Sequence, residues 1–414
     1  MEQIQINKIY QSSTITTLLA SIILARLSCV ALSNIPFFTI TFIMLYAVAL
    51  IFLLIRSFGF LTKNETGALG FLIVYVFEVV LSSLISERGI FDTQAFNSYI
   101  IVILFFLYLH IKRLSNQSQK LFFVIVLSGF TVTFIYSIVK LAQDPMLSRK
   151  AATGRYFEDS VDTLSAIGGF DTVYGGLLVF VILVYLWSFL RDKKAKMLVF
   201  LIMASCIAFI VMATYGTAIV LLIFAIALII FRRNSISAFL VSIVLIVGVV
   251  CHESIGTWIM NLSDTIEYSD TFQEKINQIG YMIRYGESVG TLAGDEGRWA
   301  RIGWSLDTFS QYPIFGGFTK PDVRIGSHSE VADLLGRFGL VGFISLGSFF
   351  WITFKDIASQ ITTKLGKKML FVCISVYLAI AVLDPALYTQ QILPIFILVP
   401  FVEKWAKPQG EVIS

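Results

Sequence analysis

Long apolar stretches alternate with short polar segments along almost the whole chain. A helix needs about 20 mostly apolar residues to cross the hydrocarbon core of a bilayer. Twelve stretches approach this requirement: 14–33, 36–55, 67–86, 94–111, 120–141, 171–190, 196–214, 216–231, 235–251, 334–354, 369–384 and 387–403. The division of 196–231 into two spans rests on Thr214–Thr217 as a tight turn. We therefore expect an all-α integral membrane protein with about 12 transmembrane helices.

The distribution of Lys and Arg predicts how these helices are oriented. Short loops rich in these residues lie on the cytoplasmic side of a membrane. With alternating spans and a cytoplasmic N-terminus, basic clusters such as 191–196 and 364–368 fall inside, and the short outer loops contain only Arg88. Both chain ends are therefore predicted to be cytoplasmic, in a multi-pass protein of the cytoplasmic (inner) membrane.

Composition excludes two broad classes of protein. Of the 414 residues, 57% are hydrophobic and 14% are charged, whereas soluble domains carry roughly 45–50% and about 25%. A water-soluble enzyme is excluded because its surface would be largely apolar. The net charge of +4 is spread over small clusters, which gives no support for nucleic-acid binding. The four cysteines are expected to be small core residues: Cys29, Cys206, Cys251 and Cys373.

Two predicted outer segments are longer than simple connections need to be. They are an outer loop at 142–170 and a large extracytoplasmic loop at 252–333 between spans 9 and 10. Loops of this length are usually functional or disordered, and helical spacing in the second predicts that it is folded. We expect three parts: 1–251 with helices 1–9, 252–333 with the catalytic block, and 334–414 with helices 10–12 and a cytoplasmic tail.

The large loop contains a predicted amphipathic helix that begins at Arg298 and ends before Pro313. Arg298, Arg301 and Ser305 share one face of it. The helix either lies at the membrane interface with its arginines on lipid phosphate, or binds a lipid-linked diphosphate through Arg298 and Arg301. Arginine suits the second task because its rigid fork donates paired hydrogen bonds to phosphate oxygens. Apolar residues recur along another face: Trp299, Ile302, Leu306 and Phe309.

A second predicted helix leads from the loop into the next span. Ser327 and Glu330 have the spacing of a capping box, which predicts that His328 is the first helical residue. The positive end of a helix disfavours the imidazolium form, so the ring would be able to accept a proton as a general base. The alternative is a histidine that only caps or packs at the membrane boundary. Asp333 and Arg337 are expected to form a local ion pair.

Three further charged residues stand out. The loop at 142–170 mixes both charges and is explained either as a solvated loop or as a second contact for an anionic substrate through Arg155. Arg26 and Glu78 lie at similar depths within predicted spans. Because unpaired charges there are costly, we expect a structural pair, with a substrate contact as the alternative.

The order of the motifs resembles the O-antigen polymerase and O-antigen ligase superfamily of polytopic membrane glycosyltransferases. The likeness consists of many spans and a late outer loop with Arg-x-x-x-x-x-Trp and Pro-x-x-Gly, followed by Ser-His-Ser and Leu-x-x-x-Gly-Leu-x-Gly. The motif block covers 298–342. Its residues are Arg298, Trp304, Pro313, Gly316, Ser327, His328, Ser329, Leu335, Gly339 and Gly342.

This resemblance implies a GT-C-like fold and a metal-independent, cofactor-free glycosyl transfer with inversion, on the outer face of the membrane. Donor and acceptor would be oligosaccharides on polyprenyl diphosphate, as in capsule or O-antigen synthesis. His328 would be the base, and Arg298 would hold the leaving diphosphate. The residues themselves add Arg301 and Arg155 as candidates for the diphosphate, with Ser327 and Glu330 in support. The implied partners are the lipid bilayer and a protein that regulates chain length.

The chain departs from the family pattern in two places, and two other functions stay open. The second glycine of Pro-x-x-Gly-x-Gly is displaced, because the chain reads Gly316-Gly317-Phe318. Members often carry an arginine in a short outer turn where this chain has Tyr215-Gly216, so Arg155 or another outer-loop arginine would replace it. One alternative function is a ligase that moves finished glycan to another acceptor. The other is a flippase or transporter of lipid-linked oligosaccharides, although such proteins tend to have related halves and polar sites at the membrane midplane.

Overall fold

In the computed structural model, described residues gather into two compact units. The first comprises residues 1–215, 344–377 and 386–414, and the second comprises 216–343 and 378–385. The structure describes residues 14–56, 58–86, 93–144, 147, 167–213, 215–230, 252–265, 298–320 and 323–406, with a few single positions between 273 and 284.

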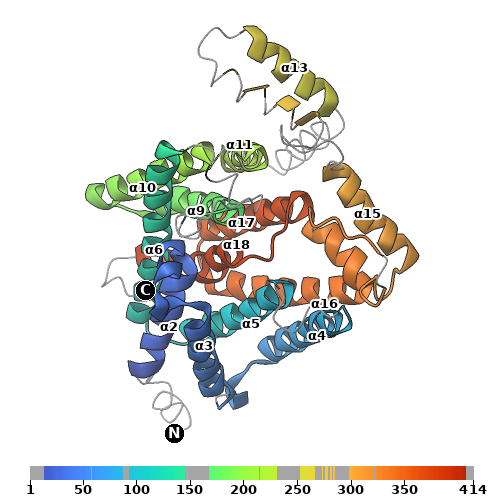
Figure 1. Cartoon of the computed structure of the whole chain (residues 1–414). Coiled ribbons are helices and arrows are strands. Elements are labelled where there is room, and N and C mark those ends of the chain that lie inside the picture. The colour runs from blue at the N-terminus through green and yellow to red at the C-terminus, as the bar shows by residue number, and fades with distance from the viewer. Residues whose placement is uncertain are drawn as a thin grey trace. The chain divides into compact units, whose positions relative to one another are not determined.

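Every regular element among these residues is a helix (Figure 1). The first unit contains α2 (Thr14–Ser28), η1 (Val30–Asn34), η2 (Pro36–Phe38), α3 (Ile40–Ile55), η3 (Phe58–Phe60), α4 (Lys63–Ile85), α5 (Thr93–Lys112), α6 (Asn116–Gln143), α9 (Phe170–Phe189), α10 (Lys193–Met212), α18 (Thr389–Leu393), η5 (Pro394–Leu398) and α19 (Val399–Ala406). The second contains α11 (Gly216–Ile230), α13 (His252–Thr265) and α15 (Arg298–Gln311). Two helices have residues in both units: α16 (Glu330–Gln360) and α17 (Lys364–Leu383).

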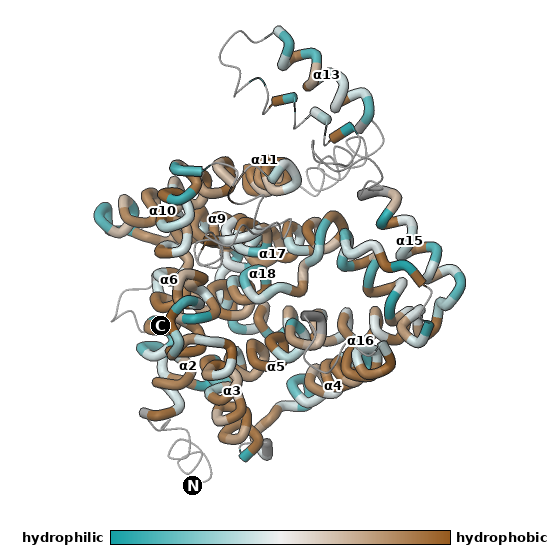
Figure 2. Tube along the Cα trace, viewed as in Figure 1, coloured by the Kyte–Doolittle hydropathy of each residue, from teal (hydrophilic) through white to brown (hydrophobic). Residues whose placement is uncertain are grey.

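The helices confirm an all-α, membrane-embedded protein. Among the described residues, seven helices are long and apolar enough to cross a bilayer: α4, α5, α6, α9, α10, α16 and α17. Three shorter apolar helices, α2, α3 and α11, fall within predicted spans. The span at 387–403 is a helix interrupted by the π-turn η5, and the span at 235–251 lies outside the described residues. Figure 2 shows that hydrophobic residues predominate along α3, α4 and α5.

Helix α9 lies at the centre of the first unit. It is buried along almost its whole length because α10 and α18 pack against it. Phe134 and Phe209 stack beside it with ring centroids 5.4 Å apart. As predicted, Cys29, Cys206 and Cys373 are free and buried, whereas Cys251 lies outside the described residues.

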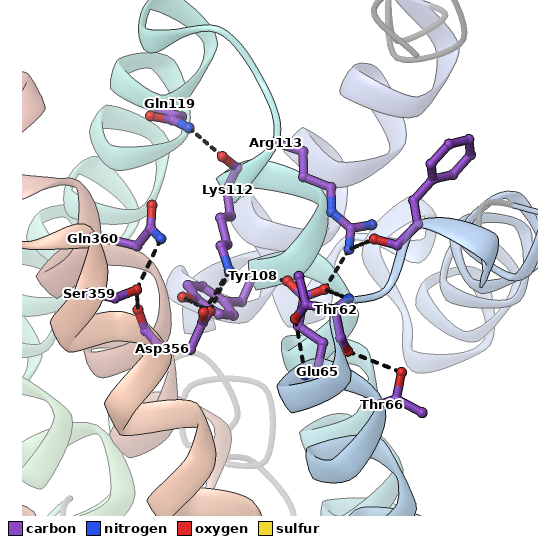
Figure 3. Close-up of polar contacts among 11 residues, drawn as sticks. Thr62, Glu65, Thr66, Tyr108, Lys112, Arg113, Gln119, Asp356, Ser359 and Gln360 are labelled. Carbon is purple, nitrogen blue, oxygen red and sulfur yellow. Dashed lines mark hydrogen bonds and ion pairs between the residues drawn. The ribbon is translucent and has the colours of Figure 1, made fainter. Parts of the chain in front are cut away.

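A network of charges joins the beginning of α4 to the ends of α5 and α16 (Figure 3). Glu65 accepts from Arg113 at 2.7 Å and from Lys112 at 3.1 Å. Lys112 also reaches Asp356 at 2.7 Å, and the Tyr108 hydroxyl donates to the same carboxylate at 2.6 Å. Glu65 is almost fully buried, and charges so placed require partners of this kind. The network therefore fixes three helix ends beside one another.

Polar contacts also join the beginning of α6, the beginning of α17 and the end of α19. Lys404 donates to Gln119 at 2.8 Å, and Gln119 donates to carbonyl groups at the end of α5. Glu403 accepts hydrogen bonds from the backbone and hydroxyl groups of Thr362 and Thr363. These contacts satisfy carbonyl and amide groups that helix ends leave without intrahelical partners.

The predicted pair between Arg26 and Glu78 is wrong. Arg26 instead donates from Nε to the carbonyl of Phe38 at 2.9 Å, where η2 ends and leaves that carbonyl available. Helix α2 packs against α3 and α6, whereas α4 packs against α5. Similar depth in the membrane therefore did not place the two side chains together. Glu78 is buried, and its Oε2 atom has no hydrogen-bond partner among the described residues.

Candidate functional site

Arg301 and His328 meet in the second unit although 27 positions separate them in the sequence. Arg301 lies on α15, and His328 lies in the loop before α16. The Arg301 Nη1 atom is 2.9 Å from Nε2 of His328. Because a guanidinium has donors and no acceptor, Arg301 must donate and Nε2 must accept. The imidazole is therefore unprotonated at Nε2 in this arrangement.

A hydroxyl and a carboxylate hold the loop that carries His328. The Ser305 hydroxyl donates to Oδ1 of Asp333 at 2.5 Å. It also accepts from the amide of Gly326 at 2.9 Å. Asp333 accepts from the amides of Ser327 at 3.1 Å and Ser329 at 3.2 Å. We call Ser305 and Asp333, with these contacts, the Ser305–Asp333 clasp.

Two residues of the held loop have unusual backbone requirements. Gly326 passes so close to α15 that a Cβ atom would collide with the carbonyl of Arg301. Ser327 has a φ of 58°, a conformation that is uncommon for residues other than glycine. The loop therefore has a specific shape that close packing and the clasp maintain together.

Helix α16 begins two residues later than the predicted helix. It starts at Glu330, and the hydroxyl of Ser329 accepts from the amide of Ala332 at 3.3 Å, as an N-cap residue does. The predicted capping box of Ser327 and Glu330 is therefore wrong. His328 precedes the helix instead of forming its first residue, because Ser329 is the better placed cap.

The Pro313–Phe318 turn inserts into a break in α16. Gly339 has non-helical angles, with φ 63° and ψ −156°. The amides of Gly317 and Phe318 donate to carbonyls of α16 at 2.8 and 3.1 Å, and two amides of α16 donate back to carbonyls of the turn at 2.8 and 3.1 Å. These contacts give a structural reason for the glycines at Gly316 and Gly339 in the family-like motif.

A contact between a cation and an aromatic ring joins α15 to the segment that precedes His328. The guanidinium of Arg324 lies 5.4 Å from the centre of the Trp304 ring, a distance suited to a cation–π interaction. Thr308 donates to the Arg324 carbonyl at 3.0 Å. Trp304 therefore packs against the chain that leads to His328.

For two other predicted site residues, Arg298 and Arg155, the structure does not describe the side chain. Arg298 is the first residue of α15, one turn before Arg301, and its side chain lies outside the described part of the chain. Arg155 lies outside the described residues altogether. The amide of Glu330 donates to the carbonyl of Asp384 at 3.3 Å, so this residue joins α16 to the segment after α17.

Sequence reasoning missed the importance of Asp333. Its carboxylate faces Ser305 and two loop amides, and its predicted ion pair with Arg337 is not among the ion pairs of the described residues. One signal was present, since Arg301 and Ser305 share a helix face. That Asp333 is the partner of this face could not be predicted from the sequence, because the contact forms only when the chain folds back from α15 to α16.

Comparison with known proteins leaves the family open. Neither models of known protein families nor curated proteins give a match to this chain. Within the described residues, no three His, Cys, Asp or Glu side chains gather as metal ligands.

Proposed function

We propose that this protein is a polysaccharide repeat-unit polymerase of the O-antigen polymerase type. It transfers a growing glycan from polyprenyl diphosphate to a second lipid-linked unit. The observation that carries the proposal is the contact between Arg301 and Nε2 of His328. This contact pairs an unprotonated imidazole nitrogen with a group that recognises phosphate. His328 is the base that the resemblance implies, and Arg301 lies one turn after Arg298, the residue that the resemblance implies for the diphosphate.

The proposed reaction requires a proton acceptor and a stabilised leaving group. The acceptor hydroxyl oxygen attacks the anomeric carbon, and its proton passes to Nε2 of His328. The bond from that carbon to the diphosphate oxygen breaks, and the electron pair leaves with the diphosphate. Arg298 and Arg301 neutralise the departing charge, with Arg155 as a further contact. Attack opposite to the leaving group inverts the configuration.

The proposed topology has twelve spans, both chain ends in the cytoplasm, and the site on the outer face of the cytoplasmic membrane. Contacts within the first unit support it. The beginnings of α4 and α6 and the ends of α5, α16 and α19 are joined by the contacts of Glu65, Lys112, Gln119, Asp356 and Lys404. All of these ends are on the cytoplasmic side in the proposed topology.

Purified protein in lipid nanodiscs, supplied with a lipid-diphosphate oligosaccharide and a metal chelator, should form a ladder of longer glycans. His328→Gln should abolish the ladder, because the acceptor hydroxyl then has no base. The loss expected from removing a general base is about 10²- to 10⁴-fold. Product length is measured by mass spectrometry, and folding by size-exclusion chromatography and thermal unfolding.

Ser310→Ala is the matched control, because Ser310 is exposed on α15 and apart from the His328 loop. Full activity of a folded His328→Gln variant would remove the proposed base. Transfer to a different acceptor without elongation would identify a ligase. Movement of the lipid-linked oligosaccharide across the membrane without a new glycosidic bond would identify a transporter.

A further inference from the structure

Asp333 contacts the backbone on both sides of His328, while its hydroxyl partner Ser305 lies on the helix that carries Arg301. We infer that Asp333, together with Ser305, is a positioning residue that holds the backbone on both sides of His328 and thereby sets the orientation of its ring beside Arg301. The catalytic consequence rests on the function proposed above. The positioning itself can be measured without activity.

The first step of the argument is the number of loop amides that the clasp holds. The amides of Ser327 and Ser329 donate to the two oxygens of Asp333, and that of Gly326 donates to Ser305. His328 lies between the two amides bound to Asp333. Rotation of the backbone at His328 would therefore break at least one hydrogen bond to a carboxylate, and such charge-assisted bonds are stronger than neutral ones.

The second step is that the clasp fixes both members of the Arg301–His328 pair. Ser305 follows Arg301 by four positions on α15, so both lie on one helix face. The hydroxyl of Ser305 is fully buried and donates to Asp333 at 2.5 Å. A shift of α15 that moved Arg301 would also move Ser305 away from the carboxylate.

The third step concerns backbone strain beside the candidate base. Ser327 has a φ of 58°, and a left-handed conformation at a residue with a side chain persists only where surrounding contacts maintain it. The hydrogen bond from its amide to Asp333 is one such contact. Removing the carboxylate would allow the loop to relax and the ring of His328 to turn.

The test uses Asp333→Asn, Asp333→Ala and Ser305→Ala. The asparagine oxygen can accept from one loop amide, but its NH₂ group cannot accept from the other, so activity should fall in the order wild type, Asn, Ala. A displacement of about 1 Å at a reacting group can cost about 100-fold in rate, and we expect a loss of this size in kcat for Asp333→Ala. Binding of polyprenyl diphosphate should weaken much less than kcat falls, because the charges of Arg298 and Arg301 are kept.

The readout that separates positioning from general stability is the imidazole itself. The chain has three histidines, so ring-labelled histidine gives few NMR signals, and His328→Gln assigns the signal of His328. In Asp333→Asn and Ser305→Ala this signal should shift or broaden. Asp307→Asn, which changes an exposed carboxylate on α15, should leave the signal and the rate unchanged.

Each result has a defined meaning. Unchanged His328 signals and unchanged kcat in folded Asp333→Asn and Ser305→Ala would overturn the inference. If the wild-type protein elongates no glycan, the proposed function fails, and the NMR signals alone then decide whether Asp333 positions the ring. If Asp333→Ala does not fold, the Asn and Ser305→Ala variants supply the same comparison.

Discussion

Serine residues on either side of His328 have different structural tasks. Ser329 caps α16 through its hydroxyl, which accepts from the amide of Ala332. Ser327 contributes its amide to Asp333 while its own backbone is in the left-handed region. The Ser-His-Ser motif therefore combines a helix cap with a strained turn, and the histidine lies between them.

This division predicts unequal effects of two substitutions. Ser329→Ala removes an N-cap and should lower the free energy of unfolding by about 1 kcal/mol. Ser327→Gly should not lower it, because glycine adopts a positive φ without the steric cost that serine bears. Denaturant titration of the two variants in the same detergent measures the difference. A larger loss for Ser327→Gly than for Ser329→Ala would contradict the assignment of the cap.

At the scale of elements, the break in α16 determines how α15 and the start of α16 are joined. The Pro313–Phe318 turn exchanges four backbone hydrogen bonds with α16 around Gly339. A Cβ atom at Gly339 would collide with the carbonyl of Ile314, and one at Gly336 would lie 2.5 Å from the carbonyl of Ser305. Glycine at Gly339 lets α16 approach the turn closely, and glycine at Gly336 lets it approach α15.

Gly339→Ala should therefore destabilise the protein by about 1–3 kcal/mol, the cost of holding a side chain in a backbone region nearly restricted to glycine. Gly347→Ala on the same helix is the matched control, because a Cβ atom there meets nothing within 4 Å. Alanine also favours helix more than glycine does. Unfolding midpoints of the two variants provide the test, and equal midpoints would show that the break tolerates a side chain.

The pattern of apolar and polar residues predicted the helices better than it predicted the contacts between them. Helical spacing correctly predicted α15 and the helix face that Arg301 and Ser305 share. The predicted break near Tyr215 is also confirmed, because α10 ends at Met212 and α11 starts at Gly216. The start of α16, the interruption at Gly339 and the partners of Arg26 and Asp333 were not predicted. Each depends on a carbonyl or amide supplied by a segment distant in the sequence.

At the scale of the whole molecule, the proposed orientation places the two ends of α16 on opposite sides of the membrane. Its first residue follows the His328 loop, and its last turns carry Asp356, which joins the charge network of Glu65 and Lys112. In that network the buried carboxylate of Glu65 and the part-buried carboxylate of Asp356 each have a cationic partner, which offsets the cost of removing them from water.

Cysteine labelling tests this orientation directly. Ser310 on α15 and Ser359 near the end of α16 are both exposed. In intact cells a membrane-impermeant maleimide should label Ser310→Cys, whereas Ser359→Cys should be labelled only after permeabilisation. The wild-type chain is the background control, since its described cysteines are buried. The reverse pattern would place the candidate site in the cytoplasm and exclude the proposed topology.

The hydrogen bond between Arg301 and His328 has a kinetic consequence for the proposed transfer. While the guanidinium occupies the lone pair of Nε2, the ring cannot take up a proton there. An anionic donor that attracts Arg301 would release this nitrogen, so the base would become competent only after the donor has bound. Substrates would then add in a compulsory order, with the donor first. An acceptor that bound before the donor would not react, because Nε2 would still be occupied by Arg301.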